Sequence, residues 1–85
     1  MPMLMENQTI PIADIHVPVK RLRTLDPERV EEIAQSMLEE GQKTPIRVRA
    51  DGKRFVLVEG LHRLEACKAL GEPTITAIIV QTPGR

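Results

Sequence analysis

The sequence predicts a small α+β domain in which a mixed β-sheet is accompanied by two helices, in the order strand, helix, β-hairpin, helix, strand. At 85 residues the chain has room for one domain. Apolar residues recur at helical spacing in two segments and alternate in others, and an Asp-Gly pair stands where a hairpin turn is expected. We expect the domain to cover residues 9–82, with short tails at 1–8 and 83–85, and both helices to cover one side of the sheet.

The first predicted strand, residues 9–12, alternates apolar and polar positions around Pro11. Proline has no backbone N–H, so it cannot donate the hydrogen bond that a strand inside a sheet needs. This strand is therefore expected at a sheet edge. Residues 13–24 carry no periodic pattern and are expected to be irregular. They contain a basic stretch, Lys20, Arg21 and Arg23.

The first predicted helix follows Asp26, a favourable N-cap, begins with Pro27 and is stopped by Gly41. Its apolar positions fall on one stripe, formed by Val30, Ile33, Ala34, Met37 and Leu38. Its acidic residues lie on the remaining face, where solvation is the simplest interpretation.

Residues 45–50 alternate, with Ile46 and Val48 on one side, as in a strand with one solvated face. Asp51-Gly52 is predicted to form the two-residue turn. Residues 54–58 are predicted to return as a strand, and their apolar run, residues 55–58, favours a place inside the sheet. Residues 61–70 form the second predicted helix, and the β-branched residues 74–80 form the last strand.

Composition excludes several classes of function. Twelve basic residues balance twelve acidic ones, which argues against simple non-specific binding of nucleic acid. No apolar run approaches the ~20 residues of a membrane span, and a single cysteine, Cys67, cannot form an internal disulfide. Cys67 is interpreted as a core residue, and His16 has no neighbour at metal-ligand spacing. We therefore expect a cytoplasmic protein with no metal site of its own.

The pattern with chemical content is the passage from the predicted strand ending at Glu59, through Gly60, into the second helix. The first amides of a helix have no intrahelical partner and carry the positive end of the helix dipole, so an anion such as phosphate can bind there. Gly60 allows a ligand to approach the backbone closely, and His62 and Arg63 add two donors in the first turn. The structural alternative is that His62 and Arg63 only support their own helix.

Residues 60–71 (GLHRLEACKALG) resemble the GERR-x-x-A-x-x-x-x-G segment of the ParB N-terminal domain, and residues 60–63 also resemble the G-C-H-R segment of sulfiredoxin. Residues 44–49 (TPIRVR) are similar to the "Q-P-I-x-V-R" strand of ParB, and residues 10–15 and 25–41 resemble its opening strand and first helix. These two families share one fold, and the resemblance spans residues 9–82.

The resemblance implies a nucleoside triphosphate, ATP as in sulfiredoxin or CTP as in ParB, bound with Mg²⁺. The phosphate-binding residues it implies are Gly60, Leu61, His62 and Arg63, with Arg21 or Arg23 as a second clamp and with Arg29 and Ser36 from the first helix. Glu32 stands at a first-helix position where a hydroxyl would help phosphate binding.

The departures from these families are also informative. Leu61 occupies the position of the cysteine that sulfiredoxin uses, which argues against reduction of sulfinic acids. ParB has a glutamate at that position and an arginine where His62 stands, so hydrolysis of CTP does not follow from the resemblance. The helix-turn-helix by which ParB reads DNA is not expected in these 85 residues.

Three hypotheses follow. The first is a nucleotide-binding module in plasmid or chromosome maintenance or DNA-linked regulation. The second is a phosphoryl-transfer or nuclease enzyme, for which Glu59 and Glu32 are the candidate catalytic acids. The third is a nucleotide-free adaptor whose acidic helix and basic hairpin dock onto DNA-maintenance proteins or onto a second copy of the chain.

Overall fold

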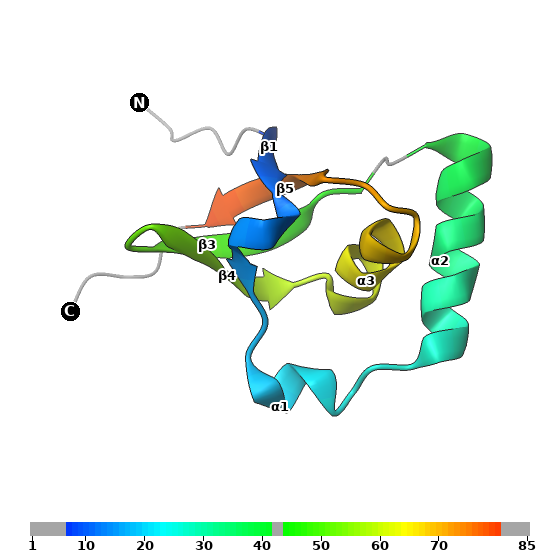
Figure 1. The fold of residues 1–85 in the computed structure, drawn as a ribbon, viewed down its shortest axis with the longest axis horizontal. Coiled ribbons are helices and arrows are strands. Elements are labelled where there is room, and N and C mark those ends of the chain that lie inside the picture. The colour runs from blue at the N-terminus through cyan, green and yellow to red at the C-terminus, as the bar shows by residue number, and fades with distance from the viewer. Residues whose placement is uncertain (1–6, 42–43, 81–85) are drawn as a thin grey trace.

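The computed structural model describes residues 7–41 and 44–80, which form a mixed five-stranded sheet with a helix packed against it and a second helix packed on the first (Figure 1). The elements, in chain order, are β1 (Asn7–Pro11), the 3-10 helix η1 (Ile12–Asp14), β2 (Ile15–His16), α1 (Val19–Leu22), α2 (Pro27–Glu40), β3 (Ile46–Asp51), β4 (Arg54–Glu59), α3 (Leu61–Ala69) and β5 (Thr74–Val80). The α+β class is the predicted one, and the predicted elements follow one another in the predicted order, with η1, β2 and α1 added before the first predicted helix. Of the predicted tails, residues 1–6 and 83–85 lie outside the described residues, and Asn7 and Gln8 belong to β1.

The sheet has the strand order β1-β5-β3-β4-β2. β1 pairs antiparallel with β5 and lies at one edge, as Pro11 predicted. β3 and β4 form the antiparallel hairpin, and β3 runs parallel to β5. Both strands of the hairpin therefore have a neighbouring strand on each side: β3 lies between β5 and β4, and β2 covers part of the other edge of β4.

The hairpin turn differs from the predicted one by one residue. The strands end at Asp51 and resume at Arg54, so the two turn residues are Gly52 and Lys53. Gly52 has φ +63°, and among the described residues positive φ occurs only at glycines. Positive φ at the first turn position alone is typical of a type II′ turn. Asp51 remains in the ladder, and its Oδ2 lies 3.2 Å from Arg54 Nε.

Residues 12–24 are more regular than the sequence suggests. Ile15 and His16 form β2, which pairs parallel with Phe55 and Val56 of β4. Ile12 and Ile15 are buried, and α1 follows with Pro18 as its N-cap. Elements of two to four residues are too short to show periodicity, so only their tertiary partners reveal them.

The ends of α2 are those that the sequence predicts. Asp26 is the N-cap, and its Oδ1 accepts a hydrogen bond from the Glu28 amide at 3.1 Å. Gly41 ends the helix with φ +82°. The predicted apolar stripe is correct except at Leu38, which is 67% exposed while Met37 is buried.

This exception follows from how the helices stack. α3 contacts β3 and β5, and α2 packs on α3 rather than beside it on the sheet (Figure 1). A helix facing one neighbouring helix buries a narrower stripe than a helix lying on a sheet. Leu64 and Cys67 of α3 are fully buried between the two layers, which confirms Cys67 as a core residue. None of the helices formed by the described residues is both long and apolar enough to cross a membrane.

Candidate functional site

The passage from β4 to α3 is held close to β3 by Gly60. Gly60 is the N-cap of α3 and has φ +110°. A β-carbon at this position would lie 2.6 Å from Ile46 Cγ2 and 3.2 Å from Ile46 Cα. Ile46 is 1% exposed and cannot withdraw. The glycine is therefore required by the packing of the junction and by its backbone conformation.

The first amides of α3 have no acceptor within residues 7–41 and 44–80. The intrahelical ladder begins with the Leu64 amide, which donates to the Gly60 carbonyl at 2.9 Å. The amides of Leu61, His62 and Arg63 precede it, and Gly60 provides no side-chain cap. Together with the helix dipole, these donors favour an anion at the start of α3.

A cavity of about 330 Å³ opens beside this helix start; we call it the arginine cavity. Its lining comes from α1, the segment after α1, α2 and the β4–α3 junction, and consists of Arg21, Thr24, Arg29, Ile33, Glu59, Gly60, Leu61, His62 and Arg63. Three of these lining residues are arginines, one from each of three helices. The structure thus brings together seven of the ten residues that the sequence singled out.

The structure also distinguishes Arg21 from Arg23. Arg21 lines the arginine cavity, whereas Arg23 does not. The Nη2 group of Arg21 donates to the Val58 carbonyl near the end of β4, which ties α1 to the sheet. A guanidinium carries five N–H donors, so Arg21 can hold this carbonyl and still donate to an anion.

His62 has a structural partner. Its Nε2 accepts a hydrogen bond of 3.0 Å from the backbone amide of Asp26, the N-cap residue of α2. Because a backbone amide can only donate, a neutral His62 that accepts at Nε2 carries its proton on Nδ1. His62 therefore joins the first turn of α3 to the start of α2, and only Nδ1–H remains for a ligand.

The remaining predicted residues contribute less. The Leu61 side chain is 5% exposed, so Leu61 can offer a ligand little beyond its amide. Glu59 is exposed and lies 3.7 Å from Arg47, its partner across β3 and β4. Glu32 lines a separate hollow with Glu31 and Gln35, and Ser36 is not in the arginine cavity. Thr24 does line it, a residue that the sequence analysis missed although it directly follows the basic stretch; its hydroxyl donates to the Arg21 carbonyl at 2.8 Å.

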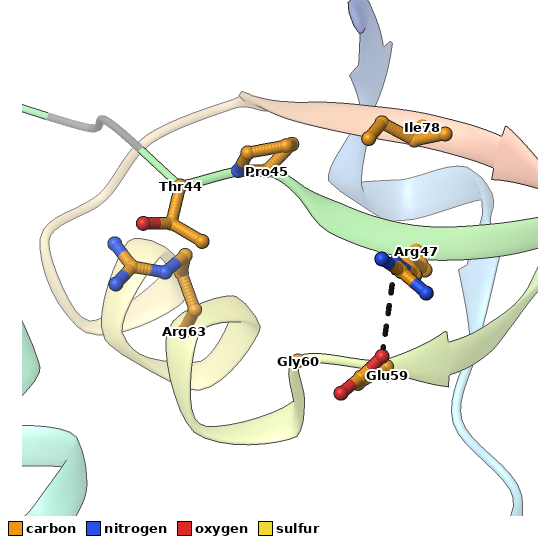
Figure 2. A pocket seen from close by; sticks show the side chains of 7 residues that line it. All are labelled: Thr44, Pro45, Arg47, Glu59, Gly60, Arg63 and Ile78. Atoms are coloured by element: carbon orange, nitrogen blue, oxygen red, sulfur yellow. Dashed lines mark ion pairs between the residues drawn. The ribbon is translucent and has the colours of Figure 1, made fainter. Parts of the chain in front are cut away.

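A second cavity, of about 400 Å³, lies on the other side of the junction (Figure 2). We call it the Thr44 cavity. It shares Glu59, Gly60 and Arg63 with the arginine cavity and adds Thr44, Pro45, Arg47 and Ile78. Sequence reasoning missed this cavity because its walls come from β3, β4, β5, α3 and the segments just before β3 and α3, which are distant in the chain. Neither cavity contains a group of three or more metal-ligating side chains among the described residues.

Comparison with known proteins assigns the family. Residues 4–85 match the ParB N-terminal domain. The chain is 39% identical over 62 residues to the probable chromosome-partitioning protein ParB of Campylobacter jejuni, a match covering 73% of this chain and 22% of that protein. It is 35% identical over 74 residues to the chloroplastic/mitochondrial sulfiredoxin of Arabidopsis thaliana, covering 87% of this chain and 57% of that protein. The chain spans about a fifth of the length of the ParB relatives that it matches.

Solved structures agree with this assignment. The crystal structure of Arabidopsis thaliana sulfiredoxin superposes with a TM-score of 0.80 at 32% identity, covering 95% of this chain and 88% of that one. The C-terminally truncated ParB of Caulobacter crescentus, complexed with CTP-gamma-S, superposes with a TM-score of 0.79 at 23% identity, covering 92% of this chain and 46% of that one. The chain therefore belongs to the ParB N-terminal domain family, within the superfamily that ParB shares with sulfiredoxin.

Proposed function

We propose that this domain binds a nucleoside triphosphate, ATP or CTP, with its phosphates in the arginine cavity and against the first amides of α3. The observation that carries the proposal is the convergence of Arg21, Arg29 and Arg63 on a helix start whose amides are not used by the helix. A triphosphate carries several negative charges, and arginine donates to phosphate oxygens in pairs.

The charges around the cavity suit such a ligand. Arg29 and Arg63 form no ion pair or side-chain hydrogen bond within residues 7–41 and 44–80, so both guanidinium groups are available. The one acidic residue of the lining, Glu59, is paired with Arg47 outside the cavity. Mg²⁺ would arrive with the phosphates and reduce their repulsion.

The relatives support the same ligand and suggest a cellular role. The Caulobacter crescentus ParB structure contains CTP-gamma-S, and another structure of that protein contains the centromeric parS site. From this relationship we propose a role in chromosome or plasmid maintenance, with DNA, a DNA-maintenance protein or a second copy of the chain as the partner. No observation favours catalysis by Glu59 or Glu32, so we propose binding without a reaction.

Calorimetric titration of the chain with ATP, CTP and GTP in the presence of Mg²⁺ tests the proposal. Arg63→Ala and Arg29→Ala should each weaken binding about tenfold or more, the range for losing a charge-assisted hydrogen bond. Arg23→Ala is the matched control, because Arg23 is exposed and outside the cavity; it should change the affinity less than about twofold. Absence of heat at millimolar nucleotide, or an equal loss in all three variants, would refute the proposal.

A further inference from the structure

The Thr44 cavity shares part of its lining with the arginine cavity but has further polar and apolar walls. Ile78, Arg47 and Glu59 stand in register on β5, β3 and β4 and form one side. Thr44 and Pro45, just before β3, form another, and Arg63 reaches in from α3 (Figure 2).

Among the described residues, Arg63 is the charged side chain of this cavity that has no partner. The guanidinium of Arg47 is matched by Glu59 at 3.7 Å. Arg63 is half-buried and has no ion pair or side-chain hydrogen bond in the described part of the chain. In Figure 2 its guanidinium points toward Thr44, away from the Arg47–Glu59 pair. A half-buried cation beside a hydroxyl favours an anionic group that accepts from both.

The charge and size of the cavity select the kind of anion. Two arginines and one glutamate leave one net positive charge, which matches a single carboxylate better than a doubly charged phosphate. Pro45 and Ile78 are half-buried and offer an apolar wall. A volume of about 400 Å³ is near the lower end of ligand pockets.

We propose that the Thr44 cavity binds a small organic carboxylate, whose carboxylate group pairs with Arg63 and Thr44 and whose apolar body lies on Pro45 and Ile78. Because Arg63 lines both cavities, one guanidinium serves two anionic ligands. Each ligand should therefore weaken the other by the same factor, through competition for Arg63 and through repulsion between the anions. This coupling rests on the proposed nucleotide binding, whereas the carboxylate site does not.

The probe is 3-methylbutanoate, which has one carboxylate and a branched apolar body, and its neutral control is 3-methylbutanamide. Both are titrated into the ¹⁵N-labelled chain, and amide shifts are followed by NMR. Titration with 3-methylbutanoate should shift the backbone amide signals of Thr44, Arg47 and Ile78 until they reach a plateau. Titration with 3-methylbutanamide should not. Thr44→Val should weaken the carboxylate about two- to tenfold, as expected for one lost hydrogen bond. Arg63→Gln should weaken it more.

Arg29→Ala provides the opposite control, because Arg29 lines only the arginine cavity. It should leave the carboxylate affinity unchanged and weaken the nucleotide, while Thr44→Val should leave the nucleotide unchanged. Carboxylate saturation without nucleotide binding would refute the proposed function and retain the Thr44 site. The inference would be overturned if 3-methylbutanoate and 3-methylbutanamide shifted the NMR signals equally, or if the carboxylate shifted residues of the arginine cavity instead. It would also be overturned if a folded Thr44→Val variant bound the carboxylate as tightly as the original chain. If both ligands bind and neither changes the affinity of the other, only the coupling would be refuted.

Discussion

Gly60 lies so close to Ile46 that no side chain fits between them: a β-carbon on residue 60 would be 2.9 Å from Ile46 Cβ and 2.6 Å from Ile46 Cγ2. The sequence alone suggests that this glycine exists to let a ligand approach. The structure supplies a reason that holds without any ligand, because the glycine lets the start of α3 sit against β3. The same close packing fixes where the free amides of α3 are presented.

Gly60→Ala should therefore be strongly destabilising. A positive φ costs a non-glycine residue about 1–2 kcal/mol, and the clash with Ile46 adds about 1–3 kcal/mol. Gly71→Ala is the matched control, since Gly71 has φ +77° but nothing within 4 Å of its added β-carbon. Urea denaturation should show the larger loss at residue 60. Equal losses would mean that Ile46 imposes no steric limit.

Removing the acceptor on His62 should loosen the start of α2. In His62→Ala the Asp26 amide loses its partner, with an expected cost of about 1 kcal/mol in the free energy of unfolding. Hydrogen exchange of the Asp26 amide should accelerate. His62→Gln, whose amide oxygen can accept, should recover part of both effects. Unchanged exchange at Asp26 in His62→Ala would show that this hydrogen bond does not hold the helices together.

Two leucines on the two helices should differ sharply in their contribution to stability. Leu64 on α3 is fully buried, so Leu64→Ala should cost about 2–5 kcal/mol in the free energy of unfolding. Leu38 on α2 is 67% exposed, and Leu38→Ala should change stability by less than about 0.5 kcal/mol. Thermal or urea unfolding of both variants measures the contrast. A large loss at Leu38 would contradict the narrow contact between α2 and α3.

Glu59→Gln tests whether the acid at the junction takes part in nucleotide binding. In the ion pair between the two residues, the Arg47 side chain is 58% exposed and the Glu59 side chain 70%. The free energy of unfolding should therefore change by less than about 0.5 kcal/mol. If the triphosphate binds as proposed, loss of this negative charge should leave the affinity the same or slightly higher. Calorimetry with Mg²⁺ and ATP or CTP measures it. Loss of Mg²⁺-dependent binding would instead identify Glu59 as a metal ligand.

The sequence by itself determined the α+β class, the order of the longer elements and the bounds of several of them, because their signals are local. Asp26, Pro27 and Gly41 mark the ends of α2 through capping chemistry, which depends only on neighbouring residues. Residues 74–80 form β5 as predicted, since a β-branched run favours a strand wherever it pairs. The free amides at the start of α3 also follow from a strand, a glycine and a helix in succession.

Only the tertiary structure decided which residues meet. Arg21 rather than Arg23 lines the cavity because α1 is anchored to Val58, a residue 37 positions away. The interhelical hydrogen bond of His62 and the alignment of Arg47 with Ile78 likewise join segments distant in the chain. Local patterns carry no information about such long-range contacts, which depend on how the hydrophobic surfaces of separate elements pack together.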